Sequence, residues 1–140
     1  ASLDVSIQAQ IVGLLEGLQR ELGLTYLFIS HDLGLVRYFC HRIVVMYLGR
    51  IVEVLPTPRT PPRHPYTVAL MESSFEADPT RRRVITRLSG EIPDAYKPPP
   101  GCAYAARCGS ATERCRSERP ALSLNNWRDG HEVACHHPQV

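Results

Sequence analysis

The chain has 140 residues, 44% of them hydrophobic, which suffices for one domain with its own core or for a partial core with an appendage. Its formal net charge of +2 gives no reason to expect nucleic acid as a partner, because phosphate binding needs a dense basic surface. No apolar run reaches the ~20 residues of a membrane-spanning helix and no signal peptide opens the chain, so we expect a soluble protein that could dock on a membrane protein.

The N-terminal part of the sequence predicts a helix, a buried strand and a second helix. Asp4 is suited to cap a helix, and apolar residues then recur at helical spacing as far as Leu22, with Gly23 placed to end it. Residues 25–30 form a short apolar, aromatic run that predicts a strand buried on both faces, and an amphipathic helix follows at about 33–40. Such a strand needs neighbouring strands, which this chain barely supplies.

Two more apolar runs, residues 42–47 and 50–54, predict a pair of strands joined by a tight turn at Leu48 and Gly49. Helix, strand, helix and two strands make half of an α/β layer. The predicted fold class is therefore α/β: a partial layer, followed by a small, loop-rich module that contains cysteines.

Proline marks the predicted domain boundaries. The prolines between positions 56 and 65 exclude regular helix or central strand there, and a second proline-rich spacer covers residues 93–100. A short helix is expected between them, from Thr67 to about Ser73, with Pro65 suited to its first turn. We divide the chain into residues 1–55, a linker at 56–100 and a cysteine module at 101–140.

A polar group, Ser30, His31 and Asp32, follows the predicted strand at the edge where open α/β sheets place ligand chemistry. With Ala1-Ser2-Leu3-Asp4, the hairpin and the segment His64-Pro65-Tyr66-Thr67, it occurs in the order and at the intervals found in peptide-transporter ATPases. The chain resembles the final third of an ATP-binding-cassette (ABC) ATPase subunit of that group, which implies that its α/β layer is part of a P-loop NTPase cassette. Residues 1–4 look like its dimer-interface D-loop, and residues 30–32 look like its switch-histidine loop.

This resemblance implies ATP hydrolysis by the complete protein, with Mg²⁺, at the cytoplasmic face of the bacterial plasma membrane. His31 would be the catalytic residue that positions the γ-phosphate and the attacking water, and Ser2, Asp4 and His31 would contact the nucleotide site. The implied partners are a second ATP-binding subunit, transmembrane permease subunits and, indirectly, a substrate-binding protein. Without the flanking segments, His31 would read as a structural histidine and Asp4 as a helix cap only.

The phosphate-binding elements of such an ATPase are absent from the printed sequence. It contains no G-x-x-x-x-G-K-[ST] loop and no strand with a terminal acidic pair. Leu88-Ser89-Gly90-Glu91 looks like the family's signature motif, but it follows the switch histidine instead of preceding it. We therefore expect this chain alone to hydrolyse no ATP and to bind ATP weakly or not at all.

Four cysteines, Cys102, Cys108, Cys115 and Cys135, are separated by five, six and nineteen residues. Without a secretory signal, a metal or cluster site is favoured over disulfides. The segment resembles the C-terminal extension of oligopeptide and dipeptide transporter ATPases, which implies a [4Fe-4S] cluster. The spacing is wider than in zinc knuckles and also favours a cluster. Zn²⁺, free thiols and disulfides stay open, and the alternative zinc ligands are His131, His136 and His137.

Two functions are compatible with these motifs. The first is the ATP-binding subunit of an ABC importer of oligopeptides or dipeptides, represented here by its C-terminal part. The second is a stand-alone, non-enzymatic interaction module that binds a metal or an iron–sulfur cluster. In either case we expect a metal to supply the core that the last forty residues lack, since their large apolar side chains are few. Cys40 is expected to be a packed apolar side chain.

Overall fold

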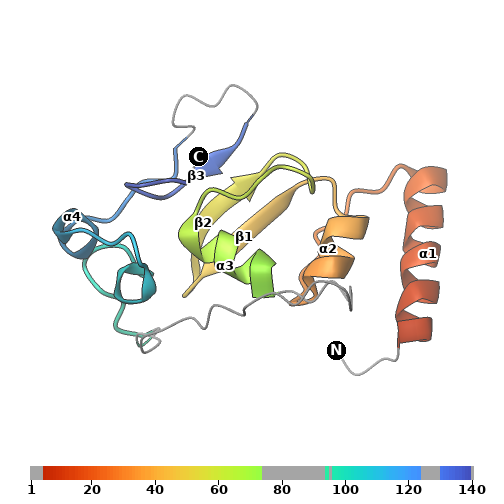
Figure 1. Ribbon diagram of the computed structural model, residues 1–140. Coiled ribbons are helices and arrows are strands. Elements are labelled where there is room, and N and C mark those ends of the chain that lie inside the picture. Colours follow the sequence, from red (N-terminus) through yellow and green to blue (C-terminus); the bar gives the residue numbers. More distant parts are fainter. Residues whose placement is uncertain (1–4, 74–93, 95, 124–129, 140) are drawn as a thin grey trace. The chain divides into compact units, whose positions relative to one another are not determined.

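The computed structural model describes residues 5–73, 94, 96–123 and 130–139 (Figure 1). Its internal contacts divide the chain into two compact units, unit 1 (Ala1–Cys40) and unit 2 (His41–Val140). Across the described ranges, no helix is long and apolar enough to cross a membrane.

Unit 1 contains the two predicted helices, α1 (Val5–Leu22) and α2 (Leu33–Phe39). Gly23 ends α1 with a positive φ of 64°, and its N–H donates to the carbonyl of Gln19 at 3.0 Å. This is the left-handed helix end that the glycine predicted, because a residue without Cβ adopts that conformation at no steric cost. Both helices are set by local signals, which is why their bounds agree with the sequence pattern.

The buried strand predicted at residues 25–30 is wrong, because the structure gives this run no strand pairing. Leu27 and Ile29 are 90% and 87% exposed. The aromatic side chains on the other side of the run do pack, with the Phe28 and Phe39 ring centroids 5.3 Å apart. A strand needs a neighbouring backbone to satisfy its N–H and C=O groups, and no described segment forms a ladder with these residues.

Unit 2 is built on an antiparallel sheet whose order is β1 (Ile43–Tyr47), β2 (Arg50–Leu55) and β3 (Glu132–Val133). The predicted hairpin is confirmed. Leu48 and Gly49 turn the chain with φ values of 46° and 73°, the pattern of a two-residue turn that suits the twist of paired strands. The fold is therefore mixed α/β, but its described sheet is antiparallel.

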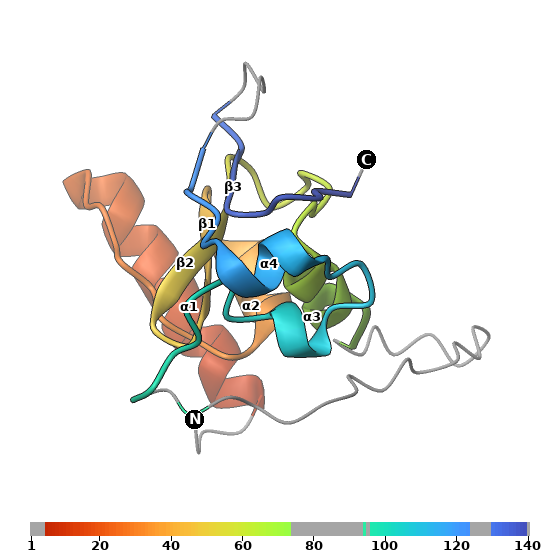
Figure 2. The same cartoon turned by 90° about the vertical axis from the view of Figure 1, so that its left-hand side faces the viewer.

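The core of unit 2 lies around β2. Along β1, buried and exposed side chains alternate, whereas the last four residues of β2, Val52 to Leu55, are all buried. Leu55 and Val133 have no exposed surface. Helix α3 (Pro65–Ser73) lies beside one face of the β1–β2 hairpin in both Figure 1 and Figure 2. It starts at Pro65, two residues before the predicted start at Thr67, and proline suits this first helical turn.

The C-terminal segment of unit 2 combines η1 (Ala105–Arg107), α4 (Glu113–Ser117) and β3. Gly101 is buried against the backbone of α4, and the neighbouring N–H of Cys102 donates to the carbonyl of Cys115 at 2.7 Å. Because β3 pairs with β2, the cysteine segment shares a sheet with strands from the first predicted domain. The boundaries at residues 55 and 100 stay predictions.

Candidate functional site

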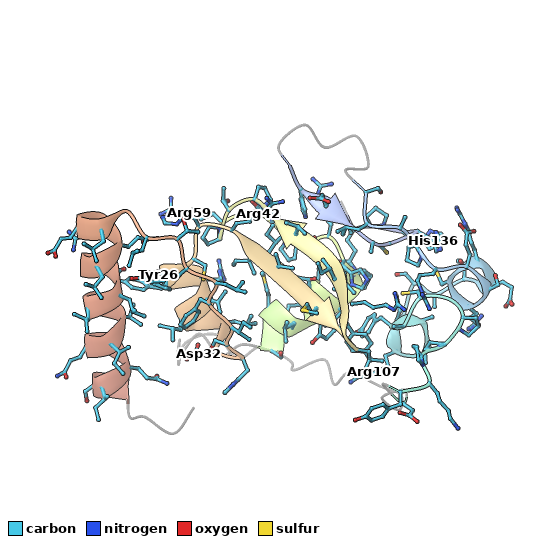
Figure 3. The ribbon with its side chains drawn as sticks, turned by 180° about the vertical axis from the view of Figure 1, so that it is seen from behind. Tyr26, Asp32, Arg42, Arg59, Arg107 and His136 are labelled. Atoms are coloured by element: carbon cyan, nitrogen blue, oxygen red, sulfur yellow. The ribbon has the colours of Figure 1, made fainter. Side chains whose placement is uncertain are left out.

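His31 lies exposed between two residues that organise the start of α2. The N–H of Asp32, which is labelled in Figure 3, donates to the Ser30 hydroxyl oxygen at 3.0 Å, and the Asp32 carboxylate accepts from the N–H of Leu35 at 3.0 Å. This is an N-cap, which satisfies a free N–H of the first helical turn. Ser30 and Asp32 thus fix the loop that presents the imidazole. Ser2 and Asp4 lie outside the described residues, so their roles and that of His31 stay predictions.

The four cysteines that are far apart in the sequence line one cavity, called here the cysteine pocket. Its cavity volume is about 10 Å³, within about 310 Å³ of empty space that includes open solvent. All four thiols are free in the structure. The residues lining the pocket are His64, Pro65, Cys102, Tyr104, Ala105, Cys108, Ser110, Cys115, Cys135, His136 and His137.

Short elements place each thiol at the pocket. Cys102 and Cys108 flank the turn of η1, Cys115 is buried within α4, and Cys135 follows β3. Two thiols already have polar neighbours, since the N–H of His137 donates to the Cys135 sulfur at 3.3 Å and the Thr112 hydroxyl lies 3.5 Å from the Cys115 sulfur. Backbone turns, and not long elements, therefore hold the four sulfur atoms around one space.

Burial disfavours the thiolate form of two of the pocket cysteines. It raises the pKa of Cys102, and it raises the pKa of Cys135 to about 11, and in both cases the neighbouring cysteines add to the rise. A bound cation would reverse this preference, because it stabilises thiolates. Among the described residues, no three His, Cys, Asp or Glu side chains have the arrangement of a metal site.

Aromatic rings form the wall between the pocket and the sheet. The ring of Tyr47 lies 4.6 Å from Tyr66 and 5.4 Å from Tyr104, measured between centroids. Burial raises the pKa of Tyr104, and the nearby Arg107 guanidinium opposes that shift. Figure 3 shows Arg107 and His136 at the end of unit 2 that carries η1 and α4.

His64 is the most buried side chain that lines the pocket, with 1% of its surface exposed. Its Nδ1 accepts from the N–H of Tyr66 at 3.1 Å, while its Nε2 has no hydrogen-bond partner among the described residues. Burial lowers the pKa of His64 to about 4, against the opposing charge of Glu53, so the ring is neutral at pH 7. A neutral ring that accepts at Nδ1 carries its proton on Nε2. A buried N–H without a partner costs about 1–3 kcal/mol.

Behind this histidine lies a fully buried carboxylate, which sequence reasoning missed. Glu53 on β2 has no exposed surface and accepts hydrogen bonds from the backbone N–H groups of Arg63 at 2.7 Å and His64 at 3.2 Å. Its Oε1 lies 2.7 Å from Nε2 of His131. The available signal was an acidic residue inside a run of β-branched and apolar residues. This network ties β2, the loop before α3 and the segment before β3 together.

The histidines offered as alternative zinc ligands separate into two groups. His131 is paired with Glu53 and does not line the cysteine pocket, which removes it from the candidate ligands. His136 and His137 do line it, but their Nε2 atoms contact the Glu118 carbonyl at 3.0 Å and the Thr112 hydroxyl at 3.0 Å. Metal ligation by the four thiols stays a prediction.

Comparison with known proteins connects both units to one family. Residues 53–115 match the family described as oligopeptide/dipeptide transporter, C-terminal region. The chain is 49% identical over 138 residues to the probable peptide ABC transporter ATP-binding protein y4tS of Sinorhizobium fredii, covering 97% of this chain and 38% of the relative.

Two further relatives give the same result. The dipeptide transport ATP-binding protein DppF of Haemophilus influenzae is 45% identical, covering 98% of this chain and 42% of the relative. The di/tripeptide transport ATP-binding protein DppF of Pseudomonas aeruginosa is 46% identical, covering 99% and 43%. The chain thus spans about two fifths of the length of these curated relatives. It belongs, as a C-terminal region, to the family of oligopeptide/dipeptide ABC transporter ATP-binding proteins.

Proposed function

We propose that this chain is the C-terminal portion of an ATP-binding subunit that energises ABC-type import of oligopeptides or dipeptides. The observation that carries this proposal is identity of 45–49% to proteins with such names over 97–98% of the chain. In the complete protein, ATP and Mg²⁺ bind between two such subunits. The subunit docks on permease subunits at the cytoplasmic face of the plasma membrane and works with a substrate-binding protein.

His31 is the residue of this chain to which we assign the catalytic role. Its exposed imidazole follows an extended run and is held by the Ser30–Asp32 turn, so it can reach a nucleotide without rearranging α2. There it hydrogen-bonds the γ-phosphate and orients the attacking water, which places charge in the transition state. Ser2 and Asp4 contact the same nucleotide from the subunit seam. The exposed apolar side chains at residues 27 and 29 support this proposal, because a sheet from the rest of the protein would bury them.

A chimera tests the proposal directly. This chain replaces the matching segment of the Sinorhizobium relative, which is then assayed for ATP hydrolysis with its permease. We expect the chimera to be active and H31A to lose about 10²–10³-fold in turnover. H41A, a change at another exposed histidine, should stay near the parent rate. An inactive chimera, or equal rates for the two variants, contradicts the assignment. Separately, the 140-residue chain titrated with mant-ATP should show no micromolar binding.

A second role, metal holding by unit 2, is favoured by the convergence of Cys102, Cys108, Cys115 and Cys135 on one cavity. The donor set fits a thiolate-bound group, and a polar N–H in the lining lacks a partner. A single Zn²⁺ requires four sulfur atoms at about 2.3 Å from one point, whereas an iron–sulfur cluster spreads its ligands around a larger body. The spacing of the four cysteines, which is wider than in zinc knuckles, supports a [4Fe-4S] cluster over zinc. Such a cluster supplies one-electron chemistry and a structural anchor.

Metal analysis separates these possibilities. After anaerobic purification, iron, sulfide and zinc are measured per chain, and we expect iron and sulfide in equal amounts. C115S, at the buried thiol of α4, should abolish binding. C40S is the matched control, because Cys40 belongs to unit 1 and does not line the pocket. Zinc alone would favour the zinc alternative, and no metal in either protein would contradict the role. Removal of the metal should expose the amides after Gly101 to hydrogen exchange first.

A further inference from the structure

The cysteine pocket contains a hydrogen-bond donor that the metal-holding role does not yet use. His64 lines the pocket, is 1% exposed, and keeps its Nε2 without a partner in the described part of the chain. Buried donors are almost always paired in native structures, so an unpaired one indicates a missing acceptor. The other nitrogen cannot serve, because Nδ1 already accepts from the N–H of Tyr66 at 3.1 Å.

The backbone holds this imidazole in place. The N–H of His64 donates to Oε2 of Glu53 at 3.2 Å, and its carbonyl accepts from the N–H of Val68 at 3.0 Å in the first turn of α3. The Tyr104 ring lies beside it, with 6.0 Å between the ring centroids. With both backbone groups and Nδ1 engaged, the ring has little freedom to turn Nε2 toward another part of unit 2.

Besides the hydroxyl groups of Tyr104 and Ser110, the side chains that line the pocket offer the four sulfur atoms as acceptors for this N–H. The lining includes no carboxylate, and the Nε2 atoms of His136 and His137 already contact the Glu118 carbonyl and the Thr112 hydroxyl. The four sulfur atoms are weak acceptors while they are protonated thiols. They become anionic, and much better acceptors, once a metal binds them. The unpaired donor and the four thiols therefore point to the same bound group.

We propose that the Nε2–H of His64 donates a hydrogen bond to a sulfur atom of a metal–thiolate group held by Cys102, Cys108, Cys115 and Cys135. The proposal rests on the metal-holding role proposed above. His64 acts as a positioning residue, since it contacts the sulfur and not the metal. A hydrogen bond to a coordinated sulfur offsets its negative charge, which strengthens metal retention and raises the reduction potential of a cluster.

Two substitutions of His64 distinguish the acceptor role of its Nδ1 from the donor role of its Nε2. H64N keeps an acceptor near the position of Nδ1 for the Tyr66 N–H and loses the distant donor, whereas H64Q keeps a donor near the position of Nε2. In the full chain titrated with Zn²⁺ under reducing conditions, we expect about 10–100-fold weaker affinity for H64N and near-parental affinity for H64Q. H137N is the matched control, because His137 lines the same pocket but already contacts Thr112.

Reconstitution with iron and sulfide forms the second arm and identifies which sulfur-bound group is present. There the reduction potential of H64N should fall below that of the parent chain and of H64Q. A third readout needs no variant: the Nε2–H proton resonance of His64 in the parent chain should shift downfield when metal is added.

Each outcome decides the proposal. Weakened binding in H64N alone, together with the resonance shift, supports it. Metal binding by H64N as tight as by the parent chain, or an unshifted His64 resonance, overturns the role of His64 and leaves the metal-holding role intact. If the parent chain binds neither Zn²⁺ nor iron and sulfide, both fail. If H64N does not fold, the resonance measured in the parent chain decides.

Discussion

The two compact units bury their apolar residues to very different degrees. Among the described residues of unit 1, the buried apolar side chains are Val12, Val36 and Phe39, while Leu27 and Ile29 are 90% and 87% exposed. In unit 2, Leu55 and Val133 are fully buried, and the sheet brings distant parts of the sequence together.

This difference follows from where each strand finds its partners. The β1–β2 hairpin pairs across a two-residue turn, so its partner is supplied by neighbouring sequence. The run at residues 25–30 has the composition of a parallel strand, whose neighbours come from far along a chain. A similar apolar pattern therefore gives paired strands in unit 2 and a segment without strand pairing in unit 1. Four predictions test or sharpen this comparison.

The largest effect is expected at the carboxylate that closes unit 2. E53A removes the acceptor of three hydrogen bonds, from the N–H groups of Arg63 and His64 and from His131. We expect the free energy of unfolding to fall by about 3–5 kcal/mol, because partners of a buried charge are left unsatisfied. Urea denaturation followed by circular dichroism measures it.

The control for this prediction is Glu132, a partly exposed acidic residue of β3. E132A breaks the Arg42–Glu132 ion pair at 3.2 Å, whose side chains are 58% and 30% exposed. It should cost no more than about 1 kcal/mol. Equal losses for E53A and E132A would show that the buried network does not hold unit 2 together.

The next effect is a pH dependence confined to unit 2. Burial lowers the pKa of His64 from 6.5 to about 4, so between these values the unfolded chain takes up a proton that the folded chain does not. Stability from the neutral ring is therefore present above pH ~6.5 and is lost as the pH falls toward 4, by at most on the order of 3 kcal/mol. Glu53 is the charged group beside His64 and opposes this shift. Denaturation of the metal-free chain across this range should show a shallower pH slope for H64Q; parallel slopes would contradict the prediction.

A smaller effect is expected where the cysteine segment folds against itself. In G101A the new methyl group would overlap the carbonyl oxygens of Cys115 and Arg116, which are backbone atoms and cannot easily move. We expect a loss of about 1–3 kcal/mol from this overpacking, and faster labelling of the Cys115 thiol. G109A is the control, since no atom lies within 4 Å of its added Cβ and it has no positive φ. Similar labelling rates in both variants would rule out the close approach.

The smallest effect is expected at the unpaired segment of unit 1. L27S should change stability by no more than about 0.5 kcal/mol, because the leucine is already exposed, and should reduce binding of an apolar dye. In the chimera with the Sinorhizobium relative, L27S should instead lower stability, because the rest of the complete protein would bury this position. A chimera whose stability L27S leaves unchanged would contradict the burial of Leu27.

V12A provides the contrast within unit 1. Val12 is buried in α1, so its truncation should raise the hydrogen-exchange rates of the helix.

The sequence by itself determined the elements whose signals are local. Gly23 ends α1, Leu48 and Gly49 form the turn of the hairpin, and Pro65 lies in the first turn of α3. Each of these depends on backbone conformation or on a hydrogen bond within a few residues, so the residue type alone predicts it. The resemblance to peptide-transporter ATPases was also readable, because it is carried by short motifs in a fixed order.

Only the tertiary structure decided which distant residues meet. The Glu53–His131 contact joins positions separated by 78 residues, and the sequence around either residue does not predict which residue it contacts. The four thiols were predicted as one set, but the unpaired imidazole of His64 beside them was not. The tertiary structure also decided that residues 25–30 form no strand. A helix satisfies its own backbone and a strand does not, so a strand pattern becomes a strand only where the folded chain supplies a neighbour.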